Sequence, residues 1–316
     1  MKFPAHLKSA SLLPSLLLLV SSPLLAQAVP APADWKPVEA ALGRPGQMQP
    51  GDVFKFAMPR RDLVVTKDGV SIAPGLALGS WAAFKTMGSE TMLMGDLVLT
   101  EDEIEPVMLK LQQQGIEESS IHNHLLGETP HIVYMHVEGH GDAVKLAASL
   151  AAALALTNTP VAAPALPPNA APPAPFDLDT RAVEQALDLV GKVNGGILQF
   201  SVPRKETITD SGMQIPPAMG TATAINFQPT GGGKAAISGD FVLLAAEVNP
   251  VLRALRTHGI DVEAMHNHML MDQPHLYFMH FWANSDAATL ARGLRAALNE
   301  TNSVLPGASP DKPAAK

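Results

Sequence analysis

One long internal repeat limits what this chain can fold into. When the sequence is compared with itself at an offset of 144 residues, the block IHNHLLGETPHIVYMH (residues 121–136) falls on MHNHMLMDQPHLYFMH (residues 265–280). Other matching pairs are Gly95-Asp96 with Gly239-Asp240, Glu103 with Glu247, and Pro59-Arg60 with Pro203-Arg204. This period is too long for a solenoid of small units, so it predicts two copies of one domain.

The repeat divides the chain into predicted segments. These are a signal peptide at 1–28, a first repeat domain at 33–158, a Pro/Ala-rich linker at 159–178, a second repeat domain at 179–305 and a disordered tail at 306–316. The linker sequence TPVAAPALPPNAAPPAPFD is nearly all Pro, Ala and Val, a composition that favours extended polyproline structure. The tail PGASPDKPAAK is typical of a disordered terminus.

Composition narrows the class of protein. Hydrophobic residues make up 47% of the 316 residues and charged residues 16%, which is typical of chains with packed cores. The net charge is −8 and lysine and arginine form no basic stripe, so we expect no nucleic-acid partner. The chain has no cysteine, which excludes disulfides, thiolate metal ligands, cysteine nucleophiles and a lipid-modified cysteine.

The beginning of the sequence has the pattern of a secretory signal peptide. Lys2 and Lys8 give a positive start, an apolar run covers residues 12–25, and Ala26-Gln27-Ala28 has small residues at the spacing of a cleavage site. The run is short and contains proline, and no later stretch reaches the length of a membrane span. We therefore expect a periplasmic or secreted protein with no stable membrane span after cleavage; an uncleaved anchor is the alternative.

Each repeat has the pattern of an α+β domain. In the second copy, AAISGDFVLL predicts a strand, AAEVNPVLRALRTHGI a helix, DVEAMHNHM and HLYFMHFWA two strands, and AATLARGLRAALNE a helix. The order of these elements favours a mainly antiparallel sheet with helices on one face. This arrangement is similar to a ferredoxin-like sandwich, and a circularly permuted version of that topology is the alternative. Residues 51–94 are rich in β-forming residues, but their strands cannot be placed from the sequence.

The repeated histidines predict a metal site in each copy. Residues two apart on a strand share a face, so His122 and His124 point the same way, and an antiparallel partner strand with His136 opposite His122 adds a third imidazole. Neutral imidazoles suit zinc, copper, iron or nickel. The candidate ligands are His122, His124 and His136 with His131 as a fourth, and His266, His268 and His280 with His275 as a fourth.

Other repeated residues have structural interpretations. Asn123 and Asn267 are expected to tie the hairpin backbone. Glu103 and Glu247 are expected in the first turn of a helix, where they suit its dipole; the alternative is that these carboxylates complete the metal sites. Asp142 and Asp286 are expected as N-caps, and Asp96 and Asp240 in turns. The methionines Met265, Met269 and Met279 alternate out of phase with the histidines, so we expect them to face a helix layer rather than to bind copper.

Several familiar motifs are not matched. The contiguous letters HNH differ from the nuclease signature, in which these residues lie far apart. TGGGKA at residues 230–235 lacks the spacing and the Ser or Thr of a phosphate loop, so no nucleotide cofactor is expected. The sequence has no G-x-S-x-G elbow and no H-E-x-x-H helix.

Taken together, the block GD…E-x-x-P-V…G-I…H-N-H…P-H…M-H in both copies resembles the LppY/LpqO family of exported bacterial proteins. That resemblance covers residues 35–158 and 179–303, and it implies export and a duplicated domain of unknown function without supplying catalytic residues. Some members of the family look like lipoproteins, whereas this chain has no cysteine to modify.

Three functional hypotheses follow from these observations. The first is an exported protein that binds a transition metal through its histidine-rich hairpins. The second is a hydrolase-like enzyme in which the same histidines act as acid–base groups or metal ligands. The third is a non-enzymatic binding or structural module of the cell envelope, in which the histidines serve as hydrogen-bonded structural residues.

Overall fold

Both halves of the chain fold into the same order of elements, as the sequence repeat predicts. The computed structural model describes Met1 and residues 34–160 and 176–306. The predicted signal peptide and tail, and most of the predicted linker, therefore lie outside the described residues. Both repeats belong to one structural unit that begins at Asp34.

The first repeat is a six-stranded antiparallel sheet with three helices. Its elements are α1 (Lys36–Leu42), β1 (Gln47–Gln49), β2 (Val53–Pro59), β3 (Thr66–Lys67), β4 (Val70–Ser71), β5 (Gly79–Met87), β6 (Glu90–Thr100), α2 (Glu101–Gln113), β7 (Glu117–His122), β8 (Ile132–Gly141) and α3 (Ala143–Leu154). The strand order in the sheet is β1-β2-β5-β6-β8-β7, and β3 pairs separately with β4. The segment 51–94 thus supplies strands to the sheet.

The second repeat has the same architecture. Its elements are α4 (Thr180–Leu187), β9 (Lys192–Asn194), β10 (Ile197–Pro203), β11 (Thr209–Asp210), β12 (Met213–Gln214), η1 (Pro217–Met219), β13 (Ala222–Gly231), β14 (Lys234–Leu244), α5 (Ala245–Thr257), β15 (Asp261–His266), β16 (Asp272–Gln273), β17 (Leu276–Asp286) and α6 (Ala287–Leu298). Its sheet order, β15-β17-β14-β13-β10-β9, is that of the first repeat read from the other edge. The predicted α+β class is confirmed, and the ferredoxin-like topology stays a prediction.

Short polar signals fix where the helices begin. Asp142 accepts a hydrogen bond from the backbone N–H of Lys145 (2.9 Å), and Asp286 does the same for Thr289 (2.8 Å), so both predicted N-caps are confirmed. Glu103 lies in the first turn of α2, as predicted, and accepts from the backbone N–H of Thr100 (3.0 Å).

The same glutamates also neutralise a buried arginine in each repeat. The Arg60 side chain is fully buried, and its Nη1 lies 2.6 Å from a carboxylate oxygen of Glu103. It also donates to the backbone oxygen of Val98 (2.7 Å). Arg204 makes the equivalent pair with Glu247 at 2.7 Å. Each pair joins the end of β2 or β10 to the start of α2 or α5, which explains why both members recur in the repeat.

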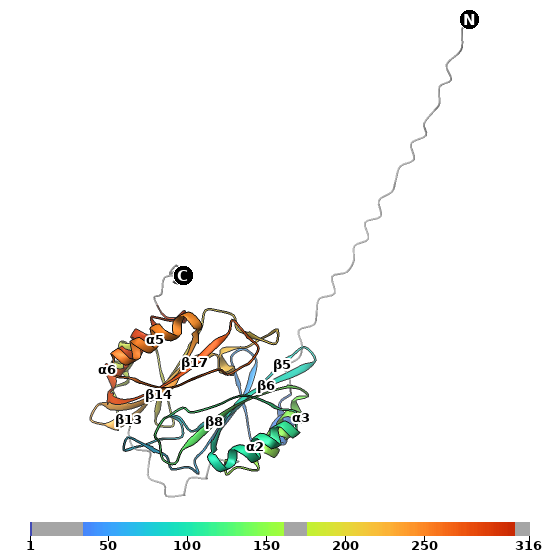
Figure 1. Ribbon diagram of the computed structural model, residues 1–316, viewed down its shortest axis with the longest axis horizontal. Coiled ribbons are helices and arrows are strands. Elements are labelled where there is room, and N and C mark those ends of the chain that lie inside the picture. The colour runs from blue at the N-terminus through green and yellow to red at the C-terminus, as the bar shows by residue number, and fades with distance from the viewer. Residues whose placement is uncertain (2–33, 161–175, 307–316) are drawn as a thin grey trace. The chain divides into compact units, whose positions relative to one another are not determined.

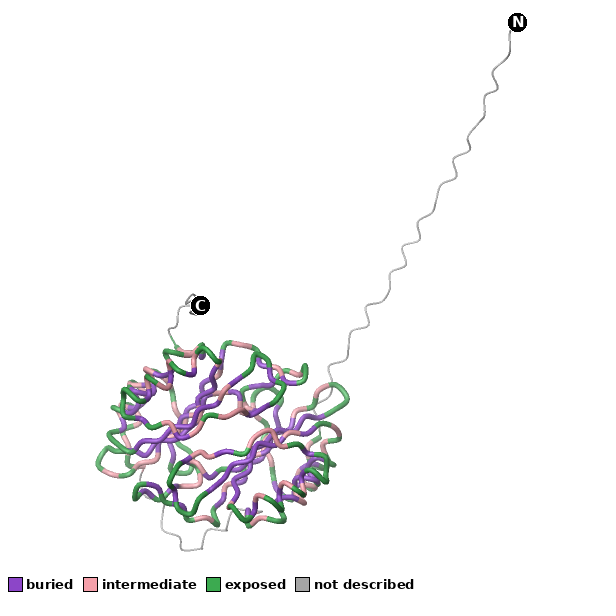
Figure 2. Tube along the Cα trace, in the orientation of Figure 1, coloured by how far each residue is buried: buried purple, intermediate pink, exposed green. Residues whose placement is uncertain are grey.

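Helices cover only one face of each sheet, and the other faces turn toward each other. Figure 1 shows α2 and α3 on one side of the two sheets and α5 and α6 on the other. The buried residues follow the strands through the middle of this arrangement (Figure 2). Two cores lie between the helices and their own sheet, one in each repeat.

Two further apolar clusters join the repeats. The first interface cluster contains Val65, Val70, Ile72, Leu76, Leu78, Val98, Leu125, Ile132, Tyr134, Ile197, Ala236 and Trp282. The second interface cluster contains Val53, Ala83, Met92, Met94, Ile208, Ile215, Met219, Val242, Met269, Leu276 and Phe278. Each combines side chains from both repeats, so hydrophobic burial holds the two sheets together.

Candidate metal centre

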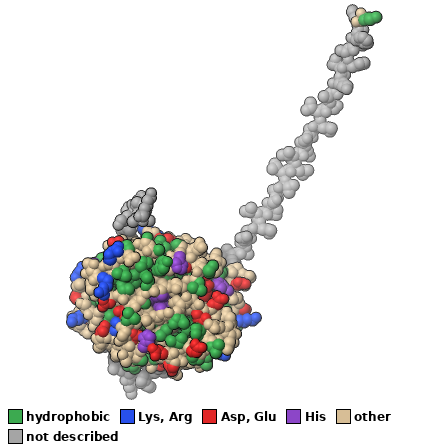
Figure 3. Space-filling view, in the orientation of Figure 1, with side chains coloured by type: hydrophobic (Ala, Val, Ile, Leu, Met, Phe, Trp, Pro, Cys, Tyr) green, Lys and Arg blue, Asp and Glu red, His purple; other side chains and the backbone are tan. Residues whose placement is uncertain are grey.

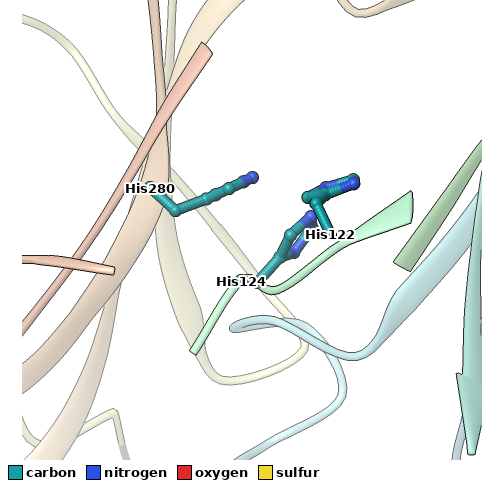
Figure 4. A group of neighbouring side chains, drawn as sticks. All are labelled: His122, His124 and His280. Atoms are coloured by element: carbon teal, nitrogen blue, oxygen red, sulfur yellow. The ribbon is translucent and has the colours of Figure 1, made fainter. Parts of the chain in front are cut away.

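Six histidines from the two repeats meet between the sheets. The histidine cluster consists of His122 and His136 on β7 and β8, His266 and His280 on β15 and β17, and His124 and His268 in the loops that follow β7 and β15. Ring centroids lie 3.6 Å apart for His122 and His266, 3.8 Å for His124 and His280, and 3.8 Å for His136 and His268. Every one of these pairs joins one repeat to the other. Figure 4 shows His280 reaching from its strand toward His122 and His124.

The sequence predicted a separate site in each repeat, and this arrangement is different. Two three-donor groups in the cluster mix the repeats: His122 with His124 and His280, and His122 with His136 and His266. A third group, Asp240 with His266 and His268, lies within the second repeat. The donor atoms within each group lie within 4.8 Å of one another. The faces that carry the histidines are the faces that pack together, so the two half-sites become one.

The hairpin register differs from the expected one by two residues. The strands pair His136 with Ser120 and His122 with Tyr134, rather than His136 with His122, and β7 has a bulge between Glu118 and Ser120. Because the side-chain period of a strand is two, a shift of two keeps His122 and His136 on the same face. Their ring centroids are 5.0 Å apart.

Several ring nitrogens of the cluster have no hydrogen-bond partner among the described residues. His280 Nδ1 donates to the backbone oxygen of Gly239 (2.8 Å) and His266 Nδ1 to that of Asn267 (3.1 Å), which leaves a lone pair on each Nε2. Among the described residues, the buried Nε2 atoms without a hydrogen-bond partner belong to His122, His124, His136, His266 and His280. A metal-bound histidine characteristically donates its other N–H to a carbonyl in this way.

Burial lowers the pKa of four imidazoles of the cluster and so favours their neutral form. Desolvation lowers the pKa of His124 to about 3, with the nearby His266 adding to the effect. It also lowers the pKa of His136, His268 and His280 well below the ordinary value, and neighbouring imidazoles reinforce this. A neutral imidazole keeps the lone pair that a metal ion requires.

Two aspartates lie beside the histidine cluster, within strands rather than in the turns that the sequence predicts. Asp96 lies in β6 and Asp240 in β14. Asp240 Oδ2 is 3.1 Å from His268 Nε2, and Asp96 Oδ2 is 3.4 Å from His124 Nε2. Desolvation raises the pKa of the Asp96 carboxyl. The signal that identifies them is an acid within an apolar strand, present in both copies.

The two remaining candidate histidines do not join the cluster. The side chain of His131 is 44% exposed and contacts Glu101 and Asn123. The side chain of His275 is 49% exposed and pairs with Asp272 at 2.7 Å. Among the described residues, neither histidine is part of a three-donor group in the histidine cluster. The predicted role as a fourth ligand therefore gives way to surface hydrogen bonding.

Residues beside the histidines hold the loops in place. Asn267 Nδ2 donates to the backbone oxygens of Met269 (3.1 Å) and of Ser119 in the other repeat (3.0 Å), so it ties its own loop and the interface as well. Met279 packs in the core beneath the helices, as predicted. Met269 instead lies in the second interface cluster, and Met265 is 55% exposed. The phase argument fails for these two because the strand ends before Met269 and because β15 is an edge strand.

A cleft of about 1460 Å³ opens beside the cluster. His124, His136, His268, His280 and both aspartates line it. Lys55 and Trp81 also line the cleft; Lys55 Nζ lies 4.0 Å from the centroid of the Trp81 ring and donates to the backbone oxygen of Ala218 (3.0 Å). Burial lowers the pKa of Lys55 to about 8.

The charged groups of the surface are dispersed. On the face drawn in Figure 3, acidic and basic side chains are interspersed with hydrophobic ones, and a few histidines are visible between them.

None of the helices described here has the length and apolar character needed to cross a membrane.

Comparisons with known proteins identify a family without a known activity. No curated protein matches the sequence. Among solved structures, a trimeric bacterial microcompartment shell protein PduB is similar at 11% identity, over 79% of this chain and 87% of that one, but its TM-score of 0.18 supports no conclusion about fold. Residues 36–156 and 181–300 each match the model described as Domain of Unknown Function (DUF1259). These matches cover most of the sequence, and the chain therefore belongs to that family, with two copies of its domain.

Proposed function

We propose that the chain binds transition-metal ions through the histidine cluster between its repeats. The observation that carries this proposal is the convergence of five buried Nε2 atoms that lack hydrogen-bond partners among the described residues. Neutral imidazoles suit zinc, copper, iron and nickel, and Asp96 and Asp240 add carboxylate oxygens that zinc also accepts. His122 and His266 each belong to two of the three donor groups, and every group contains at least one of them, so these two residues are the ones to change in a test.

Metal analysis of the purified full chain tests this proposal. We expect about one or more equivalents of metal per chain when the protein is produced with trace metals, and His122→Ala with His266→Ala should remove the share that the histidine cluster holds. The matched control is His131→Ala with His275→Ala, which changes two histidines outside the cluster and should leave the metal in place. Less than about 0.1 equivalent in the wild type, unchanged by the cluster variant, would contradict metal binding.

A melting experiment separates metal binding from a purely structural role. We expect a chelator to lower the melting temperature of the wild type by more than that of the His122→Ala/His266→Ala variant, since a ligand that binds only the folded state stabilises it. If the histidine substitutions lower the melting temperature equally with and without chelator, the non-enzymatic structural module becomes the better account.

A hydrolase-like activity is the second candidate, and the cleft favours it. Four of the cluster histidines line a cleft that also contains Lys55, a cation suited to an anionic substrate. A metal with a free coordination position activates water for hydrolysis. We would test metal-loaded protein on p-nitrophenyl phosphate and p-nitrophenyl acetate. Loss of turnover in both His268→Ala and Lys55→Met supports the enzyme; turnover that both variants retain rejects this site as its origin.

We also propose that the chain is exported and that it belongs with the LppY/LpqO proteins. The positive start, apolar run and Ala26-Gln27-Ala28 support export. Fractionation of expressing cells, followed by N-terminal sequencing of the mature protein, tests the proposal. An N-terminus close to residue 29 in the periplasm or medium is expected, and an uncleaved chain in the cytoplasm would contradict it.

A further inference from the structure

The two repeats contact each other at a pair of equivalent places that differ in charge. In one of them Lys67, on β3, reaches the second repeat. Its Nζ lies 3.1 Å from a carboxylate oxygen of Glu263, and both side chains are buried, at 7% and 5% exposure. The ammonium also lies 5.5 Å from the ring centroid of Trp282. A buried carboxylate at this contact is therefore neutralised by a cation from the other repeat.

At the equivalent place an acid replaces the lysine. Asp210, on β11, occupies the position that corresponds to Lys67 on β3, because the two short strands occupy the same place in their repeats. It is 1% exposed and faces Glu138 and His140 on β8 of the first repeat. The ligand atoms of the three residues lie within 4.8 Å of one another, and His140 Nε2 is 3.0 Å from Glu138.

This contact lacks the cation that its counterpart has. Both carboxylate oxygens of Asp210 are buried, and no N–H group of the described residues donates to them. The facing carboxyl of Glu138 lies within hydrogen-bond reach of Asp210, and burial together with Asp210 raises the pKa of Glu138 to about 7. Within the described ranges, no lysine or arginine pairs with Asp210 or Glu138. The only ion-pair partner of Glu138 among these residues is His140. Two carboxylates that face each other in a buried contact repel, and an unpaired buried charge is costly. A positive charge from outside the chain resolves both problems.

We propose that Glu138, His140 and Asp210 form a second divalent-cation site, separate from the histidine cluster, which ties the two repeats together. Two carboxylates and an imidazole are ligands that zinc accepts, and manganese accepts the carboxylates. The His140 side chain is 32% exposed, so water has access to the remaining coordination positions. The bound ion occupies the place that the Lys67 ammonium fills at the equivalent contact.

Zinc titration by calorimetry on the full chain tests this site separately from the cluster. We expect Asp210→Asn and Glu138→Gln each to lose about one equivalent of zinc, both in the wild-type background and in the His122→Ala/His266→Ala background. The matched control is Asp261→Asn, which removes an exposed acid and should change nothing. If the cluster binds no metal, the loss in the second background still measures this site alone.

A substitution that reverses the charge at Asp210 distinguishes loss of the metal site from loss of folding. Asp210→Lys places a tethered ammonium opposite Glu138, as Lys67 lies opposite Glu263. We expect this variant to fold, to bind about one zinc ion fewer than the wild type, and to lose the zinc-dependent rise in melting temperature that this site supplies. If Asp210→Asn and Glu138→Gln keep the wild-type zinc stoichiometry and melting response, the two carboxylates share a proton instead and the proposal is wrong.

Discussion

At the scale of single residues, each buried arginine is matched by one acid that is near in the sequence and one that is distant. Arg60 is fully buried and pairs with Glu103 and Asp62, while Arg204 pairs with Glu247 and Glu206. The sequence repeat marks the arginines and glutamates as important, but it does not reveal which residues pair.

Removing the acid of such a pair should be costly. Glu103→Ala leaves the Arg60 guanidinium buried without its main partner, so we expect the free energy of unfolding to fall by about 3–5 kcal/mol. Urea denaturation measures the change. Glu101→Ala, in the same first turn but exposed, should cost less than about 1 kcal/mol. Similar losses for both variants would show that the pair is not what stabilises this turn.

The buried lysine of the cleft should make stability depend on alkaline pH. The pKa of Lys55 is about 8 in the folded chain, against an ordinary value of 10.5, because burial disfavours the charged form. Between these values the unfolded chain holds the proton and the folded chain does not. Stability relative to Lys55→Met should therefore rise as pH increases from 8 to 10.5. Urea denaturation at several pH values, with exposed Lys234→Met as control, checks the sign; a falling difference refutes it.

The histidines of the centre were largely predictable and its aspartates were not. The spacing of His122, His124 and His136 identifies a shared face, since the strand period survives a register error of two. The sequence favours a turn for Asp96 because acidic residues are mostly exposed, although its neighbours on both sides are apolar. An acid that interrupts an apolar strand in both copies is the better guide.

At the scale of elements, close packing of strands explains a repeated glycine. Gly95 and Gly239 precede the two aspartates of the centre, on β6 and β14. A Cβ on Gly95 would lie 2.8 Å from the backbone oxygen of Trp81, and one on Gly239 would overlap the backbone oxygen of Ala224. Neither glycine has a positive φ, so the requirement is space rather than backbone conformation.

A graded loss of stability should follow from filling that space. We expect Gly95→Ala to lower the free energy of unfolding by about 1–3 kcal/mol through overpacking, and Gly239→Ala to lower it by more. Chemical denaturation gives the order of the two effects. A larger effect at Gly95, or no effect at either glycine, would contradict the steric explanation.

At the scale of the whole molecule, the sequence predicted the duplication but not how the copies pack. The near-continuous apolar runs of β6 and β14 indicate that both faces of each sheet carry buried side chains, yet they do not say which partner covers the face away from the helices. Here the other repeat does so, through the two interface clusters. Contacts between repeats, such as that of His124 with His280, leave no periodic trace in the sequence.

The two halves should remain together after the chain between them is cut. A protease site inserted within residues 161–175 allows cleavage after folding. We expect the halves to co-elute in size-exclusion chromatography under native conditions and to separate in denaturant, because both interface clusters bury apolar side chains of each repeat. The uncut protein is the control, and separation in native buffer would contradict a stable interface.

The reciprocal histidine pairs have a consequence for how this molecule can change over time. A single repeat holds half of the histidine cluster, so an ancestor with one repeat would have needed two copies of itself to form it. In such a pair, every substitution would appear at both equivalent positions. Joining the copies in one chain replaces a concentration-dependent encounter with a fixed effective concentration. It also frees equivalent positions to diverge, as Lys67 and Asp210 have done. Duplication thus allows one inherited interface to carry different residues at its two equivalent contacts.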